Sequence, residues 1–196
     1  MNNAYTIEDD VIIIHRDLNE LDIFTMNFID ILKKHSKYLI VSGYVSISTG
    51  RTRATEDVDV LVPLMNKNDF KLLFDDLNKN GFWCAQTDNV NEAYEYLEEL
   101  ISLRFAKNKT LLPNIELIPV TEQLKKAQYY ELLNPQKIRV KTFEFNIPPL
   151  EFEILYKEIR LASKKDFDDA KHLRKLFSSD LKKEKFKEYE KIIRGT

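Results

Sequence analysis

The sequence is poor in the residues that build disulfide or zinc scaffolds, and it has no long apolar run. Cys84 is the only cysteine, which excludes an internal disulfide, and the three histidines are too scattered to hold a structural zinc. No apolar run approaches the roughly 18 to 20 residues needed to cross a bilayer. The first ten residues, MNNAYTIEDD, lack the basic and apolar regions of a signal peptide. We therefore expect a soluble, cytoplasmic protein that has no membrane partner.

Glycine is also scarce, and its distribution is uneven. Only four glycines occur in 196 residues, and two of them, Gly43 and Gly50, fall within the stretch VSGYVSISTGRTRATEDVDVLV. A glycine at the end of a strand allows the backbone to approach a ligand closely. Ser42 adds a hydroxyl beside it. A tight turn that needs small residues would explain the same pair, so the glycine alone does not define a site.

The remaining composition is that of a globular chain long enough for one domain, or for one domain with a short helical extension. Hydrophobic residues make up 43% and charged residues 32%. The net charge of -2 is uneven, because residues 157–196 carry 13 Lys/Arg against 8 Asp/Glu, a balance of +5. This basic end could meet a phosphate-rich partner such as RNA, but interleaved Lys and Glu also describe an ordinary solvated helix.

Hydrophobic periodicity predicts an α+β fold. The expected strands are 11–14, 38–43, 56–62, 102–106, 114–120 and 138–147, with an irregular stretch through Gly50. The expected helices are 19–36, 67–79, 89–100, one starting near Thr121, and then 150–163, 166–178 and 181–194. Two prolines, at 148 and 149, suggest a boundary. We predict an α/β core over 1–149 and a helical segment over 150–196 that packs on the core.

Two aspartates carry the first chemical signal. On a strand, Asp57 and Asp59 point to the same side, while the valines between and after them pack on the other. Two adjacent carboxylates repel each other and are costly at the edge of an apolar core unless a cation lies between them. Mg²⁺ or Mn²⁺ suits such oxygen ligands and is often held together with substrate phosphates. An exposed edge strand is the alternative explanation.

Further charged residues could complete such a site. Glu116 lies within the apolar strand IELIPV and is a candidate third carboxylate, although a surface glutamate would look the same. Arg53 and Thr55 precede the first aspartate and could bind phosphate or fix the loop. Lys157 lies in the middle of an apolar stripe at helical spacing, so its side chain must either extend to solvent or meet an anion.

These residues together resemble the nucleotidyltransferase superfamily, which has the fold of DNA polymerase beta. The resemblance rests on a strand ending in small residues, then fourteen positions from Gly43 to Asp57, then DVD. The later run KEIRLASKKDFDDAKHL resembles the C-terminal motif of the AbiEii-type branch, whose members include toxins of toxin-antitoxin and phage-defence systems. The resemblance covers roughly residues 37–178. It implies a small mixed β-sheet core with flanking helices and a C-terminal helical segment that completes the nucleotide site.

The resemblance also implies a role for each matching residue. Asp57, Asp59 and Glu116 would be catalytic and would hold the metal. The nucleotide would be bound by Ser42, Gly43, Arg53, Thr55, Lys157, Lys165, Asp166 and Asp169. The chain departs from the branch at three positions: Ser42 replaces a glycine, Glu116 replaces an aspartate, and Ser163 stands where an arginine is frequent.

The resulting hypothesis is a Mg²⁺-dependent or Mn²⁺-dependent nucleotidyltransferase that moves NMP from an NTP to an acceptor hydroxyl. The acceptor could be RNA, especially a tRNA end, a protein or a small molecule, and a cognate partner protein would fit a toxin-antitoxin role. The sequence does not choose among these, and it does not give the oligomeric state. The rival hypothesis is a catalytically silent binding module, such as an antitoxin or a nucleotide sensor. A scaffolding protein would leave the DVD strand unexplained.

Overall fold

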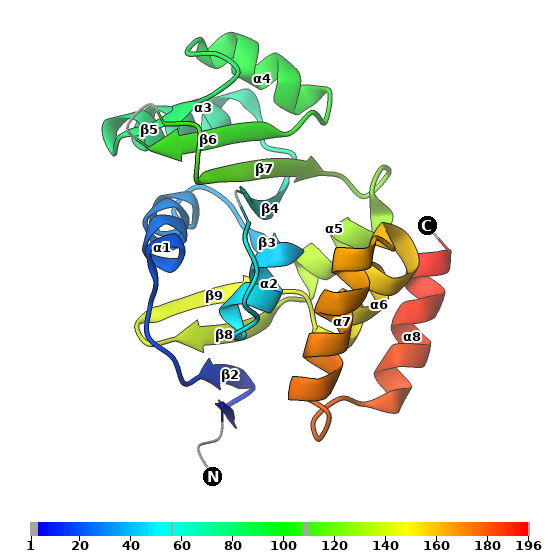
Figure 1. Cartoon of the computed structure of the whole chain (residues 1–196). Helices are drawn as coiled ribbons and strands as arrows, with labels where there is room; N and C mark the ends of the chain where they lie inside the picture. Colours follow the sequence, from blue (N-terminus) through cyan, green and yellow to red (C-terminus); the bar gives the residue numbers. More distant parts are fainter. Residues whose placement is uncertain (1–3, 56, 108–109, 196) are drawn as a thin grey trace.

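A computed structural model describes residues 4–55, 57–107 and 110–195 (Figure 1). Over these residues the chain forms two mixed β-sheets flanked by helices, and the helices that follow residue 149 gather on one side of the molecule. The predicted α+β core with a C-terminal helical segment is confirmed. The division of the chain at residue 149 stays a prediction. Within the described ranges, every helix is too short or too polar to span a bilayer.

The larger sheet has the strand order β3-β4-β7-β6-β5. Its strands are β3 (Leu39–Val41), β4 (Asp57–Pro63), β5 (Phe82–Cys84), β6 (Leu103–Lys107) and β7 (Asn114–Val120). Strands β4 and β7 are parallel neighbours at the centre, and β6 pairs with β7 in the antiparallel direction. Alternation along β4 buries Val58, Val60 and Val62 completely on one face, so the intervening aspartates lie on the other.

The smaller sheet has the order β1-β2-β8-β9. Its strands are β1 (Tyr5–Glu8), β2 (Val11–Ile14), β8 (Gln136–Val140) and β9 (Phe143–Ile147). The prediction of one strand over 138–147 is wrong, because the chain turns back at Lys141, whose φ of 53° lies in the left-handed region. Alternation holds within each strand, but its phase shifts by one residue at the turn, where two exposed residues separate the buried Val140 and Phe143.

The helices of the core are α1 (Glu20–Leu32), α2 (Gly43–Ser48), α3 (Lys67–Lys79), α4 (Val90–Glu98) and α5 (Lys126–Leu133). Phe28 of α1 packs against Phe82 of β5 and Phe105 of β6, with ring centroids 5.2 and 5.8 Å apart. Helix α2 occupies the stretch that the sequence predicted to be irregular. The predicted helix start near Thr121 is also wrong: the Thr121 hydroxyl accepts a hydrogen bond from the Leu124 N–H in a turn, and α5 starts later.

The C-terminal segment contains α6 (Leu150–Tyr156), a π-helical turn η1 (Lys157–Leu161), α7 (Lys164–Leu176) and α8 (Lys183–Arg194). Helix α6 joins the main core through Leu150 and Ile154, and it forms a second cluster with Tyr189 and Ile193 of α8. Helix α5 covers the face of the larger sheet that carries the aspartates, where Leu132 packs with Leu61, two residues after Asp59 on β4. The elements α5 and α6 thus bound the sheet face that carries the aspartates.

Candidate functional site

Three carboxylates lie together on that sheet face. Asp59 of β4 and Glu116 of β7 are directly opposite in the parallel register, and Asp57 lies two residues before Asp59. One oxygen atom of each group lies within 4.8 Å of the others. The structure therefore brings together the three residues that the sequence proposed as one acidic site.

The pKa of Asp59 lies above its ordinary value. Burial and the charge of Asp57 raise its pKa to about 6, with a further rise from Glu116, while a hydrogen bond from the Ser42 side chain lowers it. Carboxylates held this close disfavour simultaneous ionisation unless a cation neutralises them. Hard oxygen ligands at this spacing fit Mg²⁺ or Mn²⁺, so the residues present suit the metal that the resemblance implies.

Neighbouring hydroxyl groups hold the carboxylates of Glu116 and Asp57 in place. The Ser102 hydroxyl donates to Glu116 at 2.5 Å, and the Arg104 guanidinium lies 3.9 Å from the other oxygen of that carboxylate. The Thr55 hydroxyl donates to Asp57 at 3.2 Å, which gives this predicted nucleotide-binding residue a role in the loop. Sequence reasoning missed Ser102, because only the register of β6 against β7 brings its loop to Glu116.

Ser42 lies between β3 and α2, where its side chain hydrogen-bonds Asp59, and Gly43 is the first residue of α2. Ser42 has φ 63° and ψ -131°, a conformation that favours glycine. The Arg53 guanidinium lies directly over Gly43, so that a side chain at Gly43 would overlap it. Three predicted nucleotide-binding residues therefore meet at the start of α2, and Gly43 is needed for the close approach.

A buried network holds α2 in place. The Tyr44 hydroxyl donates to Asp22 at 2.6 Å, and the Arg16 guanidinium pairs with the same carboxylate at 2.5 Å. Arg16 also donates to the backbone carbonyl of Ser48 at 2.9 Å. The carboxylate of Asp22 is completely buried and also accepts from the backbone of Asn19 as part of the α1 capping box. Because the partners are far apart in sequence, no local pattern could reveal this support.

Lys157 meets anions rather than solvent. Its side chain is fully buried, and its ammonium lies 3.2 Å from Glu153 and 3.2 Å from Asp169. Asp169 also pairs with Arg51, and the Arg53 Nε lies 3.5 Å from its carboxylate. Burial raises the pKa of Glu153, and the charge of Lys157 counteracts that rise. Alternating charges therefore connect the C-terminal helices to the loop before Asp57.

The two other predicted residues of α7 have different surroundings. Asp166 is buried and forms a capping box with Ser163, so its first task is to start the helix. Lys165 is exposed, and its backbone carbonyl accepts a hydrogen bond from Arg51 at 3.3 Å. The structure places Asp169 in the charged network but does not bring the Lys165 ammonium into it. Arg51 and Glu153 belong to that network and were missed, because neither lies in a recognisable motif.

The fold of this chain is similar to that of a solved nucleotidyltransferase. A solved structure that it resembles is that of the lincosamide antibiotic adenylyltransferase LnuA in its lincomycin-bound form, with a TM-score of 0.51 and 12% sequence identity. The match covers 82% of this chain and 99% of LnuA. No protein-family model and no curated protein matches the sequence. At this identity the likeness shows the fold.

Proposed function

We propose that this chain is a nucleotidyltransferase that uses a divalent metal to move NMP from an NTP to an acceptor hydroxyl. The observation that carries the proposal is the convergence of Asp57, Asp59 and Glu116 on two adjacent parallel strands, within 4.8 Å of one another. Ser42 and Gly43 lie next to them, in the place where the resemblance puts the nucleotide phosphates. Similarity to an adenylyltransferase fold supports the same reaction class.

The reaction is a substitution at the α-phosphorus. The acceptor oxygen forms a bond to the α-phosphorus, the bond from that atom to the bridging oxygen breaks, and pyrophosphate leaves with the electron pair. Glu116 would accept the acceptor proton, and the hydrogen bond from the Ser102 hydroxyl would hold its carboxylate in position. Asp57 and Asp59 would hold Mg²⁺ or Mn²⁺. When bound, this ion would neutralise part of the negative charge on the phosphates.

Cationic groups on the Gly43 side would bind the leaving phosphates. Arg53 lies over Gly43, with its guanidinium where a side chain on Gly43 would stand. Lys157 is the further candidate from the resemblance. Since its ammonium is bound to Glu153 and Asp169, it would contact phosphate only by exchanging one of these partners. Until then it positions the arginines through Asp169.

The finer assignment is the AbiEii-type branch with a role in a toxin-antitoxin or defence system. It is supported by the motif KEIRLASKKDFDDAKHL, which supplies Lys157, Asp166 and Asp169 in their expected order. The segment 150–196 would complete the nucleotide site through this motif. A cognate partner protein would belong to the same system.

Calorimetry of NTP binding tests the proposal. Wild type should bind the nucleotide in the presence of Mg²⁺ or Mn²⁺, and the double substitution Asp57→Asn with Asp59→Asn should abolish that binding while the protein stays folded. The matched control is Asp9→Asn with Asp10→Asn, two exposed aspartates in a turn with φ values of 49° and 63° that asparagine tolerates.

Two outcomes would contradict the proposal. If the Asp57/Asp59 double variant bound NTP with the same metal dependence as wild type, these two residues would not be the metal ligands. Tight binding of Mg-NTP by wild type without pyrophosphate release toward any tested RNA, protein or small-molecule acceptor would favour the silent binding module. Pyrophosphate release is measured in parallel for that reason.

A further inference from the structure

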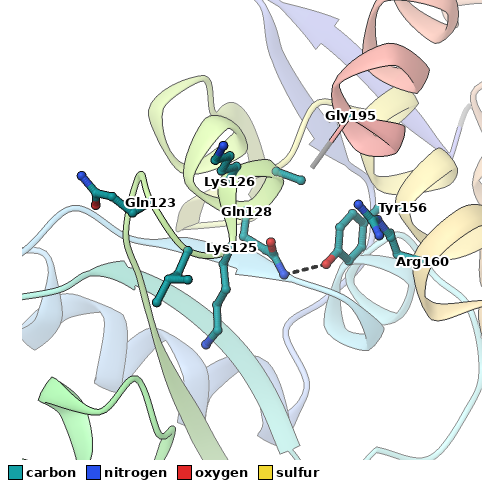
Figure 2. Close-up of a pocket in the computed structure, with 9 residues that line it drawn as sticks. Gln123, Lys125, Lys126, Gln128, Tyr156, Arg160 and Gly195 are labelled. Atoms are coloured by element: carbon teal, nitrogen blue, oxygen red, sulfur yellow. Dashed lines mark hydrogen bonds between the residues drawn. The ribbon is translucent and has the colours of Figure 1, made fainter.

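A cavity of about 370 Å³ lies between the start of α5 and the C-terminal helices (Figure 2). Lys125, Lys126 and Gln128 form one wall, and Tyr156 and Arg160 form the facing wall. Gln128 donates a hydrogen bond to the Tyr156 hydroxyl at 2.6 Å, which joins the two walls. None of the nine described residues that line the cavity is acidic, whereas three are cationic.

The cationic side chains extend toward different parts of the cavity. Lys125 extends in one direction and Lys126 in the other, so that they lie at opposite ends of the wall in this view (Figure 2). The Lys125 ammonium donates to the backbone carbonyls of Pro119 at 3.1 Å and Leu100 at 3.4 Å. The Arg160 guanidinium is fixed by two hydrogen bonds to the Ile193 carbonyl, at 3.1 and 2.7 Å. The positive charge is therefore largely preorganised.

Lys125 brings one end of the cavity wall toward the third carboxylate, because its ammonium donates to the carbonyl of Leu100, two residues before Ser102, whose hydroxyl binds Glu116. Lys125 binds the carbonyl of Pro119, which follows Glu116 by three residues on β7. Burial lowers the pKa of Lys125, and the charge of Glu116 raises it. Arg53 and Gly43, in contrast, lie at the start of α2 beside Asp59.

We infer that this cavity binds a phosphate group of the acceptor, which presents its hydroxyl to Glu116. The inference rests on the proposed nucleotidyl transfer and names the class of acceptor, a phosphate-bearing molecule. Three cations, with no carboxylate among the described lining residues, favour an anion over a neutral or cationic ligand. The phosphate could belong to the backbone of an RNA end or to a small phosphorylated metabolite, and both would use the same contacts.

The walls fit a nucleobase less well. Tyr156 is the only aromatic residue among the described lining residues, and its ring already stacks on Phe152, with centroids 6.1 Å apart and planes 13° from parallel. Its hydroxyl is engaged by Gln128. Base recognition usually needs an open aromatic face together with free edge contacts. The cavity offers charge and amide groups instead.

Binding measurements on the full chain test this assignment. The probes are a short single-stranded RNA with a free 3′ hydroxyl, glucose 6-phosphate, and lincomycin, which carries no phosphate. Lys126→Glu reverses one exposed charge of the cavity. The matched control is Lys37→Glu, an exposed lysine that lines another cavity, of about 420 Å³. Each protein is also titrated with Mg-NTP alone.

The expected result is that Lys126→Glu weakens binding of at least one phosphate-bearing probe by roughly ten-fold at low salt, while Lys37→Glu does not. For RNA, the slope of log affinity against log salt should fall in magnitude by about 0.7 for each phosphate that the protein no longer neutralises. Weaker binding of RNA alone identifies a nucleic-acid acceptor, and weaker binding of glucose 6-phosphate alone identifies a small phosphorylated acceptor. Mg-NTP affinity should stay within about two-fold, because Lys126 is an exposed residue of α5, whereas the metal-binding aspartates lie on β4.

Three results would overturn the assignment. The first is that neither phosphate-bearing probe depends on Lys126. The second is that Lys37→Glu weakens binding to the same extent, and the third is that lincomycin alone binds in a way that Lys126→Glu alters. If Mg-NTP fails to bind while phosphate binding still depends on Lys126, the proposed transferase fails and the phosphate-binding cavity stands.

Discussion

The ammonium of Lys157 lies 3.2 Å from a carboxylate oxygen of Asp169, and both side chains are completely buried. The same ammonium lies 3.2 Å from Glu153, one turn earlier on the helix. A buried charge pair contributes little net stability, but the loss of one partner leaves the other uncompensated. This arrangement gives Lys157 a structural role that any contact with phosphate would have to share.

We therefore expect Lys157→Met to destabilise the protein by about 3 kcal/mol or more, because Glu153 and Asp169 would lose a buried counter-charge. The methionine keeps most of the packing of the lysine stem. The control is Lys165→Met, an exposed position on α7, which should change the free energy of unfolding by less than about 0.5 kcal/mol. Urea denaturation measures both. A Lys157→Met protein as stable as wild type would show that the charge network is dispensable.

Gly43→Ala should separate stability from nucleotide binding. The new methyl group would overlap the Arg53 guanidinium, which is the far end of a flexible side chain and can move. We expect the free energy of unfolding to change by less than about 1 kcal/mol, because alanine suits a helix and the clash is relieved by Arg53. Displacement of Arg53 should weaken Mg-NTP binding by roughly ten-fold, since it removes a charge-assisted contact. Calorimetry of NTP binding is the measurement.

The control for that experiment is Gly50→Ala. Gly50 has φ 97°, which strains alanine, yet nothing lies within 4 Å of the added methyl group. This variant should lose stability and keep its affinity for Mg-NTP. If Gly43→Ala retained full affinity, Arg53 would not be a nucleotide contact.

Asp22→Asn tests the network that supports α2. Burial raises the pKa of Asp22, but hydrogen bonds from Arg16, Asn19 and Tyr44 and the Arg16 charge outweigh it, so the pKa lies below its ordinary value of 3.8. The carboxylate therefore contributes stability above pH 3.8 that is lost as the pH falls through the folded-state pKa. We expect Asp22→Asn to cost about 2 to 4 kcal/mol near neutral pH, because it leaves Arg16 without its counter-charge. The difference from wild type should shrink in acid, as followed by urea denaturation. A constant difference at all pH values would assign the loss to packing.

The sequence predicted the central strands of the core and the three carboxylates, because those signals are local. Apolar alternation defines β7 to the residue, and a two-residue spacing places Asp57 and Asp59 on one face. The resemblance joined Glu116 to them before the parallel register of β4 and β7 was known. These features need only one strand at a time to be recognised.

Features that depend on distant partners were not predictable. Helix α2 is six residues long, and it is held by Asp22 and Arg16 more than by its own propensity. The partners of Lys157 come from two helices, so the sequence left open whether the lysine would reach solvent or an anion. The cavity at α5 was missed because that helix starts at Lys126, after a turn that resembled a helix start at Thr121.

Asp59→Asn should make the metal-free protein more stable while removing its metal site. Burial and the charge of Asp57 raise the folded-state pKa of Asp59 to about 6, against an ordinary value of 3.8. The folded chain therefore holds an extra proton between these values, and the stability it provides is full below pH 3.8 and lost as the pH rises through about 6. Above about pH 6 the free energy of unfolding of the asparagine variant should exceed that of wild type by about 1 to 3 kcal/mol in EDTA, because it carries no buried charge to repel Asp57.

Addition of Mg²⁺ should stabilise wild type and leave the Asp59→Asn variant unchanged. Asp17→Asn, at a carboxylate that is 93% exposed, is the control and should follow wild type throughout. An Asp59→Asn protein that is less stable than wild type in EDTA at high pH would mean that the Asp59 carboxylate is already neutralised by groups of the protein itself.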